Sequence, residues 1–276
     1  MIPSFFGNPP LFGIHHPPAR RPGGGRDAVL VCPPIGHEHT RCHRALRVLS
    51  QALSRAGHHV LRFDFRGLGD SWGDPGDGGV EQWCDDIDIA LGELAARSRA
   101  ERIALVGLRA GGLLAAAALG RRRPGSSPAV GRLVLWDPIL SGREFLDTAS
   151  ALQSMFSRDA WRFPVLLFGE RNAEPLDADS RLLGYDYPAG LRESLERLEL
   201  GTIEPWPAVD TAFVLSRPSD ECESLATRLR ANRIRVDSDV VAGADGAWED
   251  YAEHEDTLRA GRLVPTIVGR LASGGR

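Results

Sequence analysis

A sharp turn between a strand and a helix constrains the fold of this chain more than any other feature. Residues 103–106, Ile-Ala-Leu-Val, are typical of a buried strand, and residues 113–119 are apolar on every side, as in a helix buried against a sheet. The segment 107–111, Gly-Leu-Arg-Ala-Gly, lies between them. Glycines at this spacing let a strand pass directly into a helix, because side chains there would collide. The same spacing also fits simple close packing of a strand against a helix, so the interpretation depends on the rest of the chain.

The rest of the chain alternates predicted strands with predicted helices. The strands are 28–32, 59–63, 133–136, 212–215 and 236–241, and the helices are 44–56, 80–94, 221–230 and 264–271. Alternation on this scale predicts a mostly parallel sheet with helices on both faces, in one domain spanning residues 1–276. Residues 141–200 break the rhythm into irregular and helical pieces, and we predict an inserted lid there.

Composition limits the chemistry and the partners. All 33 basic residues are arginine, which excludes Schiff-base and lysine-base mechanisms and suggests a bacterial coding bias. The net charge of −4 gives no reason to expect binding to nucleic acid or to a membrane surface. The four cysteines form no C-x-x-C pair, and residues 1–18 lack the pattern of a secretory signal. We therefore expect a cytoplasmic protein with reduced thiols.

Motifs on both sides of the turn resemble a known family. The segments that carry the resemblance are 32–38 (Cys-Pro-Pro-Ile-Gly-His-Glu), 43–47 (His-Arg-Ala-Leu-Arg) and 61–71 (Leu-Arg-Phe-Asp-Phe-Arg-Gly-Leu-Gly-Asp-Ser). They resemble the serine-aminopeptidase-like branch of the α/β hydrolases. Within that branch, they resemble a subgroup associated with exosortase systems and natural-product gene clusters. That subgroup typically reads Gly-Leu-Arg-x-Gly at the turn and Trp-Asp-Pro after the next strand, here residues 107–111 and 136–138. The resemblance covers roughly residues 28–200 and implies an α/β-hydrolase fold, while the activity of the subgroup is poorly defined.

The resemblance identifies the turn as a nucleophile elbow, whose apex carries the catalytic serine in ordinary members of the fold. Arg109 stands at that apex. A guanidinium stays protonated, offers no lone pair and cannot accept an acyl group. A serine acyl-enzyme is therefore excluded, and Arg109 is a candidate to hold a carboxylate or an oxyanion through paired hydrogen bonds.

The usual order of the fold suggests the other catalytic residues. The acid normally follows the strand after the lid, where Asp220 stands, and the histidine follows the last strand, where His254 stands. Asp220 can also be read as a helix N-terminal charge stabilised by the helix dipole. His254 can also be read as a solvated loop histidine among carboxylates that raise its pKa. Backbone N–H groups of Ala110 and of a residue near Ile35 would form an oxyanion hole.

The segment 36–43 is rich in side chains that can bind metals: His37, Glu38, His39, Cys42 and His43. Their spacing allows a zinc site. The resembling family keeps only His43 with the Arg-Ala-Leu that follows it, so we favour a structural role for His43 near the elbow and predict no metal and no cofactor. We place His37 at the substrate, and Glu38 at the pocket rim, where it can pair with Arg109 or Arg41.

Three functions stay open at this point. The first is an enzyme that tailors a carboxylate- or carbonyl-bearing natural product or peptide by hydrolysis with activated water, epimerisation or cyclisation. In this case His254, Glu38 or the substrate's own carboxylate moves the proton. The second is a pseudo-hydrolase that only binds its ligand. The third is a hydrolase with a different nucleophile, for which Cys32 and Cys42 lie nearest the elbow. The apolar lid suits a bulky ligand or simple packing, and the sequence does not set the oligomeric state.

Overall fold

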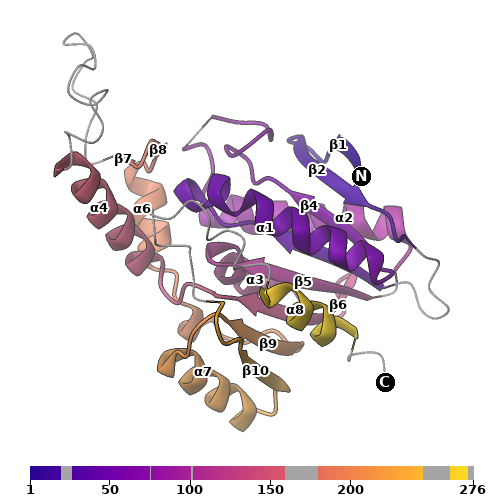
Figure 1. The fold of residues 1–276 in the computed structure, drawn as a ribbon. Helices are drawn as coiled ribbons and strands as arrows, with labels where there is room; N and C mark the ends of the chain where they lie inside the picture. The colour runs from indigo at the N-terminus through magenta and orange to yellow at the C-terminus, as the bar shows by residue number, and fades with distance from the viewer. Residues whose placement is uncertain (20–26, 75, 101, 159–179, 245–261, 273–276) are drawn as a thin grey trace.

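A computed structural model describes residues 1–19, 27–74, 76–100, 102–158, 180–244 and 262–272 (Figure 1). Its centre is an eight-stranded sheet in the order β1-β2-β4-β3-β5-β6-β9-β10. The strands are β1 (Ile2–Phe6), β2 (Leu11–His16), β3 (Asp27–Cys32), β4 (His59–Phe63), β5 (Arg102–Leu108), β6 (Ala129–Trp136), β9 (Asp210–Leu215) and β10 (Val236–Val240). All neighbouring pairs from β4 to β10 are parallel, while β2 runs antiparallel to both β1 and β4. The predicted, mostly parallel sheet is confirmed.

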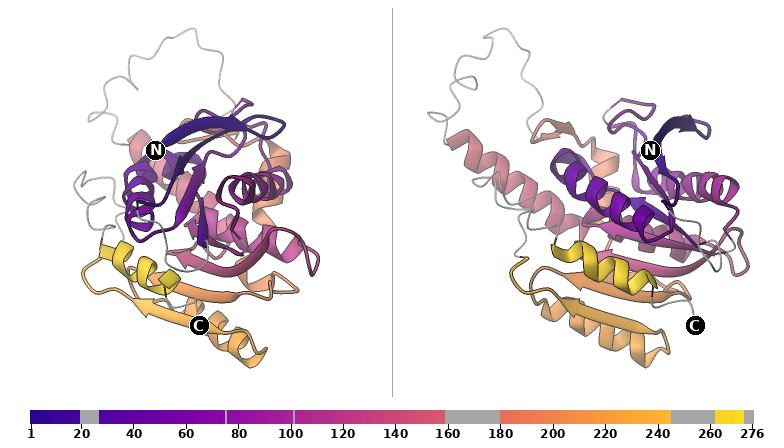
Figure 2. Two further views of the ribbon diagram at one scale, coloured as in Figure 1. Left: turned by 90° about the vertical axis from the view of Figure 1, so that its right-hand side faces the viewer. Right: turned by 45° about the vertical axis from the view of Figure 1, so that its right-hand side comes forward.

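Helices cover both faces of this sheet (Figure 2). Helices α1 (Gly36–Arg55) and α8 (Leu263–Ala272) pack on one face, and α2 (Val80–Ser98), α3 (Ala110–Arg121) and α7 (Asp220–Ala231) pack on the other. Within β3, Val29 and Val31 belong to the core under α1 and α8, while Leu30 and Cys32 belong to the core under α2 and α3. Successive side chains of a strand point to opposite faces, so a strand that is covered twice is apolar at every position.

Residues 141–200 lie between β6 and β9, and the first and last residues of this segment are neighbours in space. They contain α4 (Gly142–Arg158), a short hairpin of β7 (Arg181–Leu182) and β8 (Tyr185–Asp186), α6 (Ala189–Glu196) and the start of the short helix η1 (Leu200–Thr202). Backbone hydrogen bonds join the two ends of the segment, from Gly142 N–H to Leu198 O and from Leu200 N–H to Leu140 O. The two ends of the segment therefore lie next to each other, as in an insertion between β6 and β9. Its role as a lid stays a prediction.

The motif at residues 61–71 has a structural role. The Arg66 guanidinium donates from Nε and Nη2 to Oδ1 of Asp86 at 2.9 and 2.6 Å, and the Arg66 backbone N–H donates to Oδ2 at 2.9 Å. The Asp86 side chain is fully buried in α2. Burial raises its pKa, and the contacts with Arg66 oppose that rise. This pair ties the turn after β4 to α2, so the motif positions the backbone.

An N-terminal hairpin of β1 and β2, absent from the sequence-based prediction, forms one edge of the sheet. The Ser71 hydroxyl donates to Asp64 O and accepts from Phe12 N–H, and Asp64 N–H donates to Phe12 O. The backbone of Phe12 therefore faces β4. Because Phe5 is the partner of Phe12 in β1, the alternation of an antiparallel pair turns the backbones of Phe5 and Pro3 toward the free edge.

Candidate functional site

The turn between β5 and α3 has the backbone geometry that its sequence implies. Arg109, directly before α3, has φ 53° and ψ −123°, a region that L-residues seldom occupy. A Cβ on Gly107 would lie 2.4 Å from the Cα of Gly112, and one on Gly111 would lie 2.3 Å from the carbonyl oxygen of Pro33. Neither position has room for a side chain, and the turn holds Arg109 at the carboxyl edge of the sheet.

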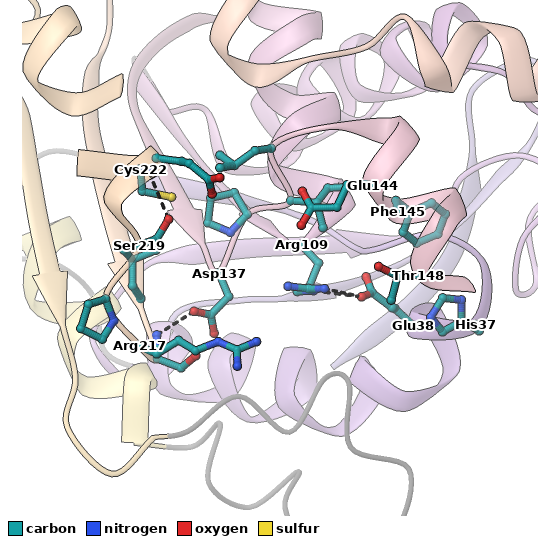
Figure 3. Close-up of a pocket in the computed structure, with 17 residues that line it drawn as sticks. His37, Glu38, Arg109, Asp137, Glu144, Phe145, Thr148, Arg217, Ser219 and Cys222 are labelled. Carbon is teal, nitrogen blue, oxygen red and sulfur yellow. Dashed lines mark hydrogen bonds and ion pairs between the residues drawn. The ribbon is translucent and has the colours of Figure 1, made fainter. Parts of the chain in front are cut away.

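The side chain of Arg109 forms a buried ion pair with Glu38. Its Nε and Nη2 atoms both lie 2.9 Å from Oε1 of Glu38. Figure 3 shows the two side chains pointing toward each other. The side chain of Glu38 is 3% exposed and that of Arg109 is 12% exposed. Of the two partners predicted for Glu38, Arg109 is thus confirmed. A guanidinium so deeply buried requires an anion beside it, because an uncompensated buried charge costs several kcal/mol, on the order of 3–5.

A small cavity of about 160 Å³ opens beside this pair. Its wall is formed by the carboxyl ends of β6 and β9, the first turns of α1 and α7, and α4 (Figure 3). The charged residues of this wall are Glu38, Arg109, Asp137, Glu144, Arg217 and Glu221. Pockets for drug-sized ligands measure about 300–1,000 Å³, so this cavity suits a small ligand or one end of a larger one.

His37 lines the same cavity, and its contact with a substrate stays a prediction. Its ring stacks on Phe145 of α4 with centroids 5.6 Å apart and an interplanar angle of 12°. Burial, and then the charges of Arg109 and Arg41, lower the pKa of His37 to about 4. The imidazole is therefore neutral near pH 7 and adds no positive charge to the site.

Asp137 is a second buried carboxylate in the cavity wall, and the sequence analysis gave it no role. It follows β6 with φ 39°, is 8% exposed, and its Oδ1 accepts a hydrogen bond of 2.6 Å from Ser216 N–H. In Figure 3 it lies between Arg109 and Arg217. The sequence does show that Asp137 directly follows a predicted strand. Only the order of strands in the sheet shows that this strand, β6, lies beside β5 and so brings Asp137 near Arg109.

The other predicted catalytic residues are not brought to Arg109 by the described part of the chain. Asp220 is exposed in the first turn of α7, while Ser219, Glu221 and Cys222 line the cavity. This position fits the interpretation of Asp220 as a helix N-terminal charge. His254 lies outside the described residues. Its role, and that of Asp220 as the acid, stay predictions.

The two expected oxyanion donors are buried next to the site. Ile35, 1% exposed, directly precedes α1, and Ala110, 2% exposed, opens α3. Between Ile35 and the cavity wall, Gly36 has φ +56°, and a Cβ on it would lie 2.0 Å from the hydroxyl of Tyr187. Tyr187 therefore packs directly on this backbone segment, which has room only for glycine. The oxyanion hole itself stays a prediction.

The histidines of α1 point in different directions. His39 Nε2 bonds Oδ1 of Asp64 at 3.1 Å at the end of β4. His43, one turn later, is exposed, with Arg62 and Asp64 as its main charged neighbours, so the expectation that it lies at the elbow is wrong. The helix begins at Gly36, which places His43 on the face of His39 and not on that of Glu38. Among the described residues, no group of three or more His, Cys, Asp or Glu side chains could hold a metal ion.

The cysteines next to the site are poorly placed for nucleophilic chemistry. All four cysteines are free and buried. Burial raises the pKa of the Cys32 thiol, and burial together with the nearby Glu38 raises that of Cys42. Because the thiolate is the nucleophile, neither of these thiols is activated.

The fold and this site define an α/β-hydrolase-fold protein. Residues 26–181 match the family described as serine aminopeptidase, S33, and because the match spans more than half of the chain, the chain belongs to this family. No curated protein matches the sequence. None of the described helices is long and apolar enough to cross a bilayer.

Solved structures with the same fold span nearly the whole chain. Est1E from Butyrivibrio proteoclasticus with bound ferulic acid has a TM-score of 0.63 at 15% identity and covers 98% of this chain and 99% of its own. Proline iminopeptidase from Mycobacterium smegmatis has a TM-score of 0.60 at 14% identity, covering 99% and 98%. Alpha/beta hydrolase domain-containing protein 10 from mouse has a TM-score of 0.58 at 18% identity, covering 99% of both chains. At these identities the likeness concerns the fold alone.

Proposed function

We propose that this protein is an enzyme of the α/β-hydrolase fold that works without a serine acyl-enzyme. Its substrate is a small molecule or peptide that bears a carboxylate or a carbonyl, from a bacterial natural-product pathway. The observation that carries this proposal is the buried ion pair of Arg109 with Glu38 at the turn after β5. The pair places a permanent positive charge and a carboxylate base beside one cavity, where ordinary members of the fold have a nucleophile.

Arg109 is the group that holds the substrate. A guanidinium binds a carboxylate through two parallel hydrogen bonds, and it stabilises negative charge that develops on a carbonyl oxygen. In a cavity walled by α4 and α7, such contacts are stronger than in water. Residues 141–200 act as a lid in this proposal, with Phe145 and Tyr187 closing over His37 and Gly36.

Glu38 and Asp137 are the candidates for proton transfer from the described residues. In epimerisation, the base takes the proton from the carbon next to the carbonyl, Arg109 holds the enolate oxygen, and a proton then returns to the opposite face of that carbon. In cyclisation, the enolate carbon instead attacks an electrophilic carbon of the same substrate, whose leaving group departs with the proton. In hydrolysis, the base takes a proton from the water that attacks the carbonyl carbon, and it returns that proton to the alcohol or amine that leaves when the acyl bond breaks. His254 remains a further candidate base. Neutral His37 can position the substrate by hydrogen bonding without taking a charge.

A second function, ligand binding without turnover, is favoured by one observation. The turn after β5 carries Arg109 in place of a nucleophile, and the thiols of Cys32 and Cys42 both have raised pKa values. A pseudo-hydrolase that binds carboxylates would need no more than this.

The test follows isotope incorporation into a panel of short peptides and ester-bearing acids. Deuterium from D₂O at the carbon next to a carbonyl reports proton abstraction, and ¹⁸O from labelled water reports hydrolysis. We expect one of these signals with the wild type and its loss in Arg109→Gln, while Glu93→Gln, which breaks a distant ion pair with Arg97, keeps it. Covalent labelling by a serine-directed fluorophosphonate would contradict the proposal. The absence of both isotopes across the panel would favour the binding module.

A further inference from the structure

The N-terminal part of the sheet carries two polar side chains on the face that α1 covers. Strand β2 pairs with β4 so that Ile14 lies opposite Arg62 and His16 lies opposite Val60. Val60 belongs to the core under α1, and side chains two residues apart in a strand share a face, so His16 and Arg62 both lie on this face of the sheet. A sheet face covered by a helix normally presents apolar side chains, and this pair departs from that pattern.

Two side chains of α1 complete a cluster with this pair. His43 and Arg47 are one turn apart on the same face of the helix, and both are exposed. Arg47 and Arg62 are charged neighbours of both His16 and His43. None of these four residues lines the cavity beside Arg109, so the arginine–histidine cluster, as we call them, is separate from the candidate active site.

Polar atoms of the arginine–histidine cluster are buried without hydrogen-bond partners. His16 is 3% exposed, and neither its Nε2 nor the buried Nε of Arg62 has a partner. In the part of the chain that the structure describes, the guanidinium groups of Arg47 and Arg62 form no hydrogen bond and no ion pair. A buried polar group without a partner is costly, so these atoms indicate a missing ligand.

The charges of the cluster indicate that the missing ligand is an anion. The nearby acid is Asp64, whose Oδ1 bonds Nε2 of His39 at 3.1 Å and whose Oδ2 accepts from Asp70 N–H at 3.2 Å. Burial lowers the pKa of Arg62, Asp64 raises it, and Arg47 lowers it again. Two guanidinium charges therefore face one carboxylate, and a guanidinium does not release its proton. Within the described residues, one positive charge of this group is left to be neutralised by a bound anion.

We propose that the arginine–histidine cluster binds a phosphate group. Each guanidinium presents N–H donors in a fixed fork, and each neutral imidazole presents one N–H, so donors from β2, β4 and α1 surround the ligand. A phosphate group carries about two negative charges and three acceptor oxygens, which suits two arginines and two histidines better than a planar, singly charged carboxylate does. This binding site is independent of the function proposed for the cavity.

Apolar side chains continue the same face of the sheet beyond the cluster. Ile14, opposite Arg62, and Phe12, two residues earlier in β2, are both half-buried. The ring of Phe5 lies against Phe12 with centroids 5.4 Å apart, and Phe5 is 63% exposed. A phosphate ester could place its apolar group on these side chains, whereas inorganic phosphate would use the arginine–histidine cluster alone.

The experiment measures binding of inorganic phosphate and of phenyl phosphate to the full chain at pH 7 by calorimetry, with backbone-amide NMR to locate the probe. We expect both probes to shift the amide signals of His16, Arg47 and Arg62. The Kd should rise at least about tenfold in Arg62→Gln and in Arg47→Gln, because each loses a charged donor. Arg55→Gln, which alters an exposed arginine in the last turn of α1, should bind as the wild type does, and so should Arg109→Gln.

Thermal unfolding controls for damage to the fold. Phosphate should raise the Tm of the wild type and of Arg55→Gln, and it should raise the Tm of Arg62→Gln and Arg47→Gln much less. Arg47 is exposed, so Arg47→Gln should fold with the Tm of the wild type in the absence of phosphate. If Arg62→Gln does not fold, Arg47→Gln decides.

Three results would overturn the site: no binding of either probe, binding that Arg47→Gln and Arg62→Gln leave unchanged, or acetate that binds as tightly as phosphate. Phosphate binding that is lost in Arg109→Gln would place the ligand in the cavity and would also overturn it. Tighter binding of phenyl phosphate than of inorganic phosphate would identify the ligand as a phosphate ester, and equal binding would identify it as the free ion. Both of these outcomes keep the site.

Discussion

Three buried histidines should make the fold sensitive to mild acid. His15 and His16, at the end of β2, are 6% and 3% exposed, and His37 at the cavity is 9% exposed. Burial is the main cause that lowers the pKa of each from 6.5 to about 4. The charges of His59 and Arg97 lower that of His15 further, and the charge of Arg62 lowers that of His16 further.

The sign of the effect follows from proton binding. Between pH 4 and 6.5 the unfolded chain binds protons on these histidines that the folded chain does not, so the free energy of unfolding decreases as the pH falls through this window. At pH 5 each histidine removes about 2 kcal/mol relative to neutral pH. Together they remove about 6 kcal/mol, which is on the order of the whole stability of a domain.

Urea unfolding followed by circular dichroism across this range checks the reasoning. Near pH 5 the slope of the unfolding free energy against pH should correspond to an uptake of about two to three protons. His15→Gln and His16→Gln should each reduce that number by about one. A slope of less than about one proton in the wild type would refute the reasoning.

Two further predictions concern stability and use urea unfolding as the assay. Gly107→Ala places a Cβ 2.4 Å from the Cα of Gly112, so the free energy of unfolding should fall by at least about 3 kcal/mol. Gly92→Ala, in open space on α2, should raise the free energy of unfolding by about 0.5–1 kcal/mol. Equal effects of the two substitutions would contradict the role given to the turn. Asp86→Asn breaks the buried pair with Arg66 and should cost about 3–5 kcal/mol, whereas Asp85→Asn, in an exposed pair with Arg121, should cost less than about 1 kcal/mol. A loss at Asp86 as small as that at Asp85 would show that Arg66 does not anchor the turn.

The parallel core of the fold was predictable because both faces of the sheet are covered. Such strands are apolar throughout, and β4 begins and ends where the sequence predicts, at His59 and Phe63. The start of α1 was placed eight residues too late, since its first turns, from Gly36 onward, carry polar residues that interrupt the apolar period. Those polar residues include His37 and Glu38, which the fold turns toward the cavity.

Within the candidate site, the sequence predicted only the contact between Glu38 and Arg109, two residues that belong to separate motifs. Glu38 and Arg109 meet because the first turn of α1 and the turn after β5 share the carboxyl edge of neighbouring strands. Predicting Asp137 as a residue of the site would have required the order of strands in the sheet, which the sequence does not specify. Asp220 was selected from the order of elements, but the period of α7 places Ser219 and Cys222 toward the cavity and Asp220 toward solvent.

Within the described part of the chain, β1 and β10 are the outermost strands of the eight-stranded sheet, and both are poor templates for adding another strand. At β1, Pro3 turns its backbone outward and has no N–H to donate, so an incoming strand would lack one of its ladder hydrogen bonds. At β10, Asp237 and Asp239 stand two residues apart, both paired with Arg270 of α8. A second β10 laid alongside would bring four carboxylates together. Proline at one edge and acids at the other therefore protect this sheet from edge-to-edge aggregation.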